Sequence, residues 1–261
     1  MNLSLKNKTA LICGSSQGIG LAAAKELAFN GANCILMARN AYTLSQALKT
    51  LPNEGSQKHQ YVVADFSDAE TVEKSVKKIA EELQVEILIN NTGGPKGGPI
   101  LDATPDNFEQ AFRQHLVCNH ILVNALIPGM KQAGYGRIIN VISTSVKTPL
   151  ANLGVSNTIR LAVAAWAKTL ANEIGRFNIT VNNVLPGLTD TGRLQDIMKQ
   201  GAAAAGRELS FIEEQLKETV PMKRFGQAEE IANVIVFLAS PAASYVNGVN
   251  WAVDGGRTPA L

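Results

Sequence analysis

Cysteine is scarce in this chain of 261 residues, and its pattern excludes several kinds of protein. Cys13, Cys34 and Cys118 lie in apolar stretches, with no CxxC pair and no His/Cys spacing typical of a metal site. We therefore expect three buried thiols in a reducing compartment, rather than a disulfide framework or a zinc site.

Long hydrophobic runs and an excess of one charge are also missing. The longest apolar runs fall well short of the roughly 20 residues that cross a bilayer, and the first apolar run is too short for a signal peptide. The net charge is +2, with no stripe of Lys and Arg, which argues against a nucleic-acid partner. These absences predict a cytoplasmic protein that binds neither membrane nor nucleic acid.

Short apolar segments alternate with longer amphipathic ones along the chain. The short segments are almost continuously apolar, which is typical of parallel strands covered on both faces. We predict strands at 9–13, 33–38, 60–64, 86–90, 137–142, 179–185 and 249–253. We predict helices at 18–30, 41–51, 68–83, 105–132, 156–175 and 227–239. Repeated strand–helix units predict one α/β domain over residues 1–261, a Rossmann-like, doubly wound parallel sheet of about seven strands.

Two helices have clear start signals, and one region breaks the alternation. Ser67 and Glu70 form the pattern of a capping box, and Thr104 followed by Pro105 predicts a helix beginning there. Residues 188–225 follow the sixth predicted strand and contain one expected helix, 210–219. An insertion at this place lies over the ligand crevice of such a sheet, so we predict a mobile lid.

A glycine-rich turn joins the first predicted strand to the first helix. The stretch "CGSSQGIG" places Gly14, Gly18 and Gly20 at a G-x3-G-x-G spacing. Glycines allow a tight turn and a close approach of backbone to a pyrophosphate, and the helix N-terminus offers N–H groups to it. A turn of this kind between a strand and a helix predicts a dinucleotide site.

The end of the second predicted strand bears on which dinucleotide is bound. Enzymes of this architecture that use NAD place an acidic residue there for the ribose 2′-hydroxyl. Here Ala38 stands at that position and Arg39 follows, and an arginine accommodates a 2′-phosphate. We therefore expect NADP(H) to be favoured over NAD(H).

Six motifs in order resemble those of the short-chain dehydrogenase/reductase family over nearly the whole chain. They are "GSSQGIG" (14–20), "ADFS" (64–67), "NNTGG" (90–94), "GRIINVIS" (136–143), "PGLTDT" (186–191) and "VDGG" (253–256). The general pattern is most similar to the 3-oxoacyl carrier-protein reductase branch. The resemblance implies a homodimer or homotetramer that binds a small-molecule substrate.

The resemblance also implies which residues hold the cofactor. Asp65 matches the residue that contacts the adenine, and Thr191 or Thr189 the one that contacts the nicotinamide amide. The full expected set is Gly14, Ser16, Gln17, Gly18, Ile19, Gly20, Arg39, Asp65, Asn91, Gly93, Arg160, Pro186, Gly187, Thr189 and Thr191.

Three of the four catalytic positions of the family depart from its pattern. The family's Ser is retained as Ser143. Its Tyr thirteen residues later and its Lys four beyond are replaced by Ser156 and Arg160. Its Asn, thirteen residues before a Pro, is replaced by His115 before Pro128.

The replacements change the available acid–base chemistry. A Ser hydroxyl is shorter and far less acidic than the phenol it replaces, and a guanidinium stays charged. One hypothesis is that His115, expected to titrate near neutral pH, donates the proton directly or through one water while Ser143 polarises the carbonyl. A second is that Arg160 pairs with a carboxylate or phosphate of the substrate.

Three functions remain open at this stage. The first is an NADP(H)-dependent oxidoreductase that reduces a carbonyl, for example a 3-oxoacyl thioester, or oxidises an alcohol, with non-standard proton transfer. The second is an inactive NADP(H)-binding sensor or partner subunit, which the loss of Tyr and Lys favours. The third is a non-redox enzyme on the same scaffold.

Overall fold

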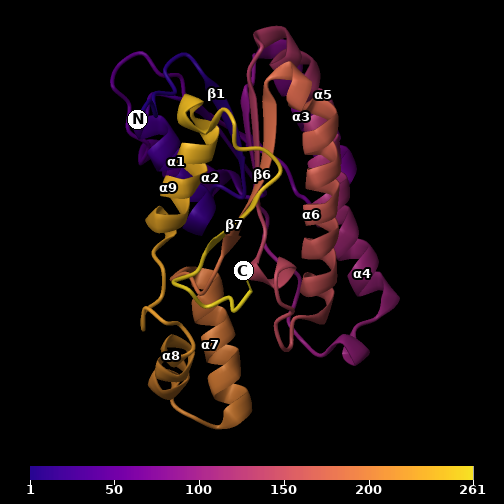
Figure 1. Cartoon of the computed structure of the whole chain (residues 1–261), viewed down its shortest axis with the longest axis vertical. Helices are drawn as coiled ribbons and strands as arrows, with labels where there is room; N and C mark the ends of the chain where they lie inside the picture. The colour runs from indigo at the N-terminus through magenta and orange to yellow at the C-terminus, as the bar shows by residue number, and fades with distance from the viewer. Residues whose placement is uncertain (261) are drawn as a thin grey trace.

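A single parallel sheet runs through the computed structural model, which describes residues 1–260 (Figure 1). Across those residues the sheet has seven strands in the order β3-β2-β1-β4-β5-β6-β7. The strands are β1 (Thr9–Cys13), β2 (Asn33–Ala38), β3 (Gln60–Val63), β4 (Ile87–Asn90), β5 (Gly136–Val141), β6 (Ile179–Pro186) and β7 (Asn250–Val253). The predicted parallel α/β fold is confirmed.

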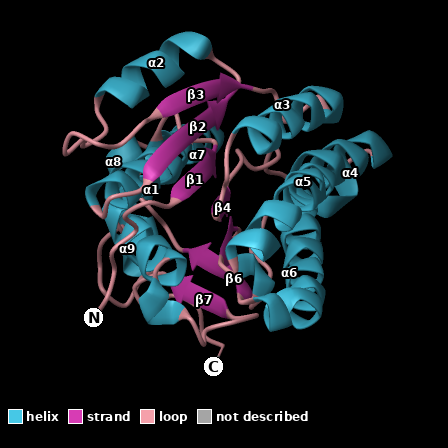
Figure 2. Cartoon of the chain, turned by 90° about the horizontal axis from the view of Figure 1, so that it is seen from above, coloured by secondary structure: helices cyan, strands magenta, loops and turns pink. Residues whose placement is uncertain are grey.

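Helices cover both faces of the sheet (Figure 2). Helices α1 (Gly18–Phe29), α2 (Ala41–Lys49) and α9 (Ala228–Ala239) share one apolar cluster with the sheet. Helices α3 (Ala69–Glu82), α5 (Cys118–Ala133) and α6 (Gly154–Ile174) share the other. Helix α4 (Pro105–Phe112) packs beside α6.

Burial on both faces explains why the strands are almost wholly apolar. Leu11 and Ile12 are neighbours in β1, and each is fully buried. Side chains alternate between the faces of a strand, so Ile12 joins the α1–α9 side and Leu11 the α3–α5–α6 side. Each such side chain contributes about 2 kcal/mol by leaving water.

A ladder of asparagine amides, buried on β4 to β6 and exposed on β7, crosses the sheet. Asn90, Asn140, Asn183 and Asn250 are register partners on β4 to β7. Each Nδ2 donates to the Oδ1 of the next asparagine, at 2.8, 2.8 and 2.7 Å. The ladder thus provides hydrogen-bond partners for most amide groups of these asparagines, which would otherwise be buried without partners.

The strand order reverses between β1 and β4, and this reversal places the crevice. Chain connections leave β1 toward β2 on one side and β4 toward β5 on the other. The carboxyl ends of β1, β4, β5 and β6 therefore meet at one edge, where ligands bind in sheets of this kind. The expected site residues follow those ends.

Several local predictions need correction. Asp68, not Ser67, caps α3, because its carboxylate accepts from Glu70 and Thr71 N–H groups. Thr104 caps α4 as predicted, with Asn107 completing the capping box. The predicted helix 105–132 is interrupted by a π-helical turn, η2 (Arg113–Val117).

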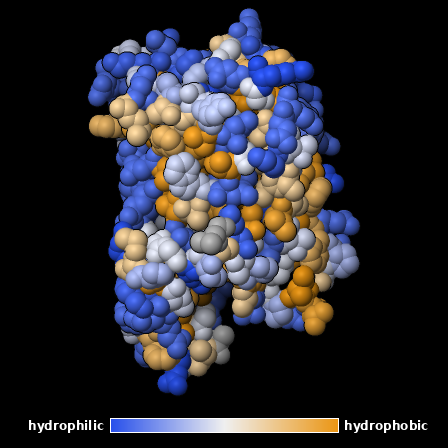
Figure 3. Space-filling view, in the orientation of Figure 1, coloured by the Kyte–Doolittle hydropathy of each residue, from blue (hydrophilic) through white to orange (hydrophobic). Residues whose placement is uncertain are grey.

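The region predicted as a lid holds two helices rather than one. Helix α7 (Gly192–Ala205) was not predicted, whereas α8 (Leu209–Glu218) was. They pack on each other through a small cluster that includes Leu194, Met198 and Phe225. In Figure 3 this lobe stands apart from the ends of α4 and α6 across a hollow at the lower edge.

The three cysteines are buried and free of disulfides, as expected. Across the described chain, no helix is both long and apolar enough to span a membrane.

Candidate functional site

The turn between β1 and α1 leaves no space for side chains at two of its glycines. Gly14 has φ +58°, and a Cβ there would lie 2.4 Å from the Asn91 carbonyl oxygen. A Cβ at Gly20 would lie 2.3 Å from the Gly14 carbonyl oxygen. The glycines thus bring the turn, the start of α1 and the end of β4 into backbone contact.

The start of α1 is open to an anion. Its N-cap, Gln17, makes no side-chain capping bond, and the first turn carries no acidic residue. The N–H groups and positive dipole end are those that bind a phosphate. Ser15 fixes the turn from behind, since its Oγ accepts the Met37 N–H at 3.0 Å. These features fit the pyrophosphate of a dinucleotide.

The end of β2 presents a cation and no carboxylate of its own. Ala38 is buried and Arg39 is exposed at the edge of the crevice. Asp65 lies near enough for Arg39 to help lower the pKa of its carboxyl, after larger contributions from hydrogen bonds to Ser67. Arg39 and Asp65 are thus near each other beyond the ends of β2 and β3, and their roles toward a 2′-phosphate and an adenine stay predictions.

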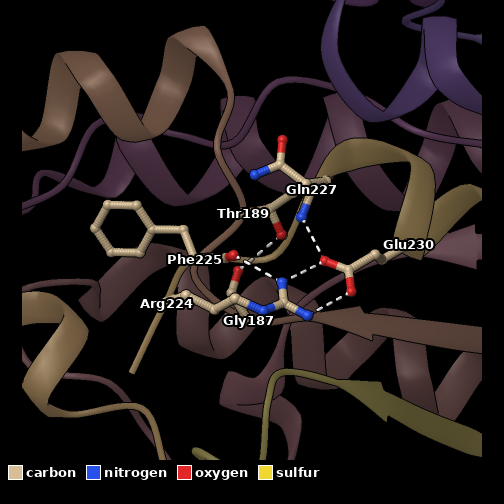
Figure 4. A network of polar contacts seen from close by, with 6 residues as sticks. All are labelled: Gly187, Thr189, Arg224, Phe225, Gln227 and Glu230. Atoms are coloured by element: carbon tan, nitrogen blue, oxygen red, sulfur yellow. Dashed lines mark hydrogen bonds and ion pairs between the residues drawn. The ribbon is translucent and has the colours of Figure 1, made fainter. Parts of the chain in front are cut away.

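The segment after β6 is fixed at its base. Thr189 and Gly226 form an isolated parallel bridge, in which the Gly226 N–H donates to Leu188 O at 2.9 Å. Figure 4 shows the neighbouring network, where Arg224 makes two 2.7 Å bonds to Glu230. Glu230 also accepts the Gln227 N–H at 2.8 Å (Figure 4). This anchoring holds residues 187–191 across the crevice from the glycine turn.

A cavity of about 220 Å³ lies between these parts. The structure brings three of the four expected catalytic residues into its wall: Ser143, Ser156 and Arg160. Other wall residues from the expected cofactor set are Ile19, Asn91, Pro186, Gly187, Thr189 and Thr191. Residues from α1, β5, α6, α7 and the segments after β4 and β6 thus share one cavity.

Ser143 follows β5 and is oriented by its own backbone neighbourhood. Its Oγ accepts the Ser145 N–H at 3.0 Å. That bond occupies a lone pair and leaves the hydroxyl hydrogen free to donate. Ser143 can therefore donate a hydrogen bond to a carbonyl oxygen in the cavity.

Ser156 and Arg160 lie one turn apart on α6, and both are buried, exposing 9% and 8% of their surfaces. The Arg160 Nη1 donates to the Val141 carbonyl at 3.2 Å. Burial, and secondarily Arg193, lower the pKa of Arg160 to about 10, so it stays charged at neutral pH. A cation thus lies in the cavity wall at the position where the sequence predicts a replaced lysine.

His115 differs from its prediction. It lies in the π-helical turn, is almost fully buried, and is absent from the cavity wall. Burial first, then the charges of Arg160 and Arg193, lower its pKa to about 2. The expectation that it titrates near neutral pH is therefore wrong, and the imidazole is neutral at physiological pH. Its Nε2 is buried and has no hydrogen-bond partner among residues 1–260.

Two residues that sequence reasoning passed over complete the site. Thr92 lines the cavity, and its Oγ1 lies 2.6 Å from His115 Nδ1. Its only signal was that it replaces the Ala of the family motif. Arg193 on α7 also lines the cavity and donates to the Gly94 and Pro95 carbonyls at 3.1 and 3.0 Å. Since α7 was not predicted, Arg193 carried no signal.

In the part of the chain that the structure describes, no group of three or more His, Cys, Asp or Glu residues is arranged to hold a metal ion.

Comparison with known proteins gives consistent matches over the whole chain. A family model described as enoyl-(acyl carrier protein) reductase matches residues 14–258. An uncharacterized oxidoreductase, YvrD of Bacillus subtilis, is 34% identical over 100% of both chains. The 3-oxoacyl-[acyl-carrier-protein] reductase FabG of Pseudomonas aeruginosa is 35% identical over 97% of this chain and 98% of its own. L-sorbose reductase from Gluconobacter frateurii, solved with NADPH and L-sorbose, superposes with a TM-score of 0.93 at 32% identity, covering 100% of both chains.

Proposed function

The chain belongs to the short-chain dehydrogenase/reductase family of oxidoreductases, and on that premise we propose that it is an NADP(H)-dependent reductase of a small carbonyl compound, or the reverse dehydrogenase. One observation carries the proposal: Ser143, with a free hydroxyl hydrogen, and the cationic Arg160 share a cavity with the expected nicotinamide-contacting Thr189 and Thr191. Bound NADPH supplies the hydride in such a site.

The proposed cofactor residues fall into sets, and each set contacts a different part of NADP(H). The open start of α1, with Ser16, Gln17, Gly18 and Ile19, holds the pyrophosphate. Arg39 holds the 2′-phosphate, and Asp65 the adenine. Asn91, Gly93, Pro186, Gly187, Thr189 and Thr191 enclose the nicotinamide end. The relatives solved with NADPH or NADP support NADP(H) over NAD(H).

Two side chains stabilise the charge that develops on the substrate oxygen. Ser143 donates its hydroxyl hydrogen, and Arg160 supplies a positive charge held away from water. Fixed donors of this kind act strongly because they need no reorganisation during the reaction. In this proposal they replace part of what a tyrosine hydroxyl would do.

In this proposal the proton that the alkoxide receives comes from water rather than from an imidazolium. His115 is neutral, so its role is to hold the Thr92 hydroxyl at 2.6 Å. The Thr92 and Ser156 hydroxyls line the cavity and can pass a proton from water to the alkoxide. His115 is thereby a positioning residue in the proposal, not the acid.

The proposal also covers the lid, the assembly and the compartment. Residues 188–225 close over the substrate as a mobile lid anchored at Gly226. Leu161 on α6 and Phe112 on α4 are half exposed and support a homodimer or homotetramer through these helices. The buried thiols fit a cytoplasmic protein. Light scattering after size-exclusion chromatography measures the assembly.

A second function, a sensor that binds NADP(H) without turnover, is favoured by the absence of Tyr and Lys at 156 and 160. Titration with NADPH and NADH, followed by energy transfer from tryptophan to nicotinamide, separates the readings when paired with a turnover assay. Micromolar NADPH binding with NADPH oxidation by a carbonyl panel supports the reductase. Binding without oxidation by any carbonyl supports the sensor, and no binding of either cofactor removes both.

A further inference from the structure

The cavity carries more positive charge than hydride transfer requires. Three arginines from separate parts of the fold line it: Arg160 on α6, Arg193 on α7 and Arg257 in the C-terminal segment. Within residues 1–260, its wall includes no Asp or Glu side chain. The cavity is therefore a concentrated positive field with no counter-charge of its own.

Two of these cations converge on one point. A Cβ atom at Gly94 would lie 3.0 Å from Arg193 Nη2 and 3.4 Å from Arg160 Nη2. Guanidinium groups this close repel each other, particularly where one is buried. A side chain at Gly94 would press on both guanidinium groups and shift them by a few tenths of an ångström.

Neither cation has an acidic partner among the described residues. The ion pairs found there involve other cations, and Asp196 acts on Arg193 only from beyond ion-pair distance. Arg160 is more than nine-tenths buried and makes one hydrogen bond, to Val141 O. An unpaired buried charge is unfavourable, and an anion between Arg160 and Arg193 would offset it.

The source of that anion follows from where the cofactor's phosphates lie in the proposed function. The start of α1 and Arg39 take those phosphates, and both are separate from Arg160. The remaining anion is on the substrate. A carboxylate suits the planar fork of an arginine, which can bind both of its oxygens.

Resting on the proposed oxidoreductase function, we infer that the substrate is a small oxo acid, or the matching hydroxy acid. Its carboxylate lies between Arg160 and Arg193, and its carbonyl oxygen meets the Ser143 hydroxyl. Arg257, which is held by Thr219 Oγ1 at 3.1 Å, adds charge at the C-terminal side. The cavity of about 220 Å³ would be shared with the nicotinamide, so the space left for the substrate suits only a short carbon chain.

The test compares each acid with its own methyl ester. Calorimetry on protein loaded with NADP⁺, which cannot reduce them, measures binding of straight-chain oxo acids of three to six carbons and of their esters. We expect the best acid to bind at least about tenfold tighter than its ester. Equal binding of acid and ester, or no binding of any acid, overturns the inference.

Variants separate the substrate from the cofactor as the source of the anion. Arg193→Gln and Arg257→Gln lie near the surface and should fold, and each should reduce the preference for acid over ester. Arg160→Lys keeps the buried charge without the fork and should reduce it less. Arg207→Gln is the matched control, since Arg207 is an exposed lid cation stacked on Phe211 outside the cavity. If Arg193→Gln weakens NADP⁺ and acid equally, the anion is a cofactor phosphate and the inference fails.

A turnover assay keeps the two proposals apart. Oxidation of NADPH by esters as fast as by acids leaves the reductase standing and removes the oxo-acid inference. Selective binding of acids without NADPH oxidation leaves the anion site standing and removes the reductase.

Discussion

The two halves of the crevice differ in the groups that form them: main-chain atoms in one and side chains in the other. The half around the β1–α1 turn is made by backbone: Gly14 and Gly20 contact main-chain atoms, and an uncapped helix supplies N–H groups. The half around Ser143 is made by side chains, among them two close cations, with the neutral His115 behind Thr92. The first half contains the predicted cofactor motif, and the second contains the positions at which the sequence predicts three replacements among four catalytic residues.

The difference shows which part of such a protein can change its chemistry. A backbone cradle tolerates little variation, because any added atom meets a neighbouring main chain. A side-chain site can be rebuilt while the cradle stays intact, since its groups come from separate elements. Binding and reaction are thus separable in this fold, and the following variants test that separation.

The largest expected effect is in the backbone half. Gly14→Ala places a Cβ 2.4 Å from Asn91 O at a φ of +58°, so the turn must move. We expect NADPH to bind at least about 100-fold more weakly, because small displacements of a built site cost that much. Fluorescence titration measures the affinity.

Gly206→Ala is the control for the Gly14 variant. Gly206 has φ +59°, yet nothing lies within 4 Å of an added Cβ. It carries the same backbone strain without the contact, so NADPH affinity should hold. Equal losses in both variants would mean that strain alone, not the close approach to Asn91, decides cofactor binding.

The next effect lies in the side-chain half and should leave cofactor binding intact. Ser143→Ala removes the hydroxyl whose hydrogen is free to donate. We expect kcat to fall about 100-fold, as when one donor to a developing oxyanion is lost, with unchanged NADPH affinity. Ser156→Ala should lower kcat less, because Thr92 still offers a hydroxyl. A larger loss in Ser156→Ala would make Ser156 the principal group.

The buried His115 should affect the pH dependence of the free energy of unfolding more than it affects kcat. Its pKa is about 2 in the folded protein and about 6.5 when unfolded. As pH falls below about 6.5, only the unfolded chain takes up this proton, so stability declines by about 1.4 kcal/mol per pH unit. His115→Asn should remove that slope in denaturant titrations from pH 7 to 5. An unchanged slope would contradict the lowered pKa.

The sequence predicts those parts of the structure that depend on backbone conformation and on the apolar pattern. Continuous apolar runs predicted the seven strands. The glycine spacing predicted the turn, which in the structure lies against Asn91. The prediction for His115 failed because its pKa depends on tertiary structure: burial first, and then the charges of Arg160 and Arg193, lower it. Both arginines are far away in the chain. Helix α7 was missed because "GAAAAG" has glycines at both ends and little amphipathic pattern, and Arg193 was missed with it.

The smallest expected effect tests an exposed side chain beside the backbone half. Arg39 is exposed, so solvent weakens its attraction for a 2′-phosphate. Arg39→Ala should therefore reduce the preference for NADPH over NADH by about tenfold, while NADH affinity stays the same. Titrations at low and high salt provide the check, because the wild-type preference should shrink with salt and that of the variant should not. A fall in affinity for both cofactors would instead assign Arg39 to the adenine or the fold. In that case the cradle, like the reacting half, would depend on side chains for more than selectivity.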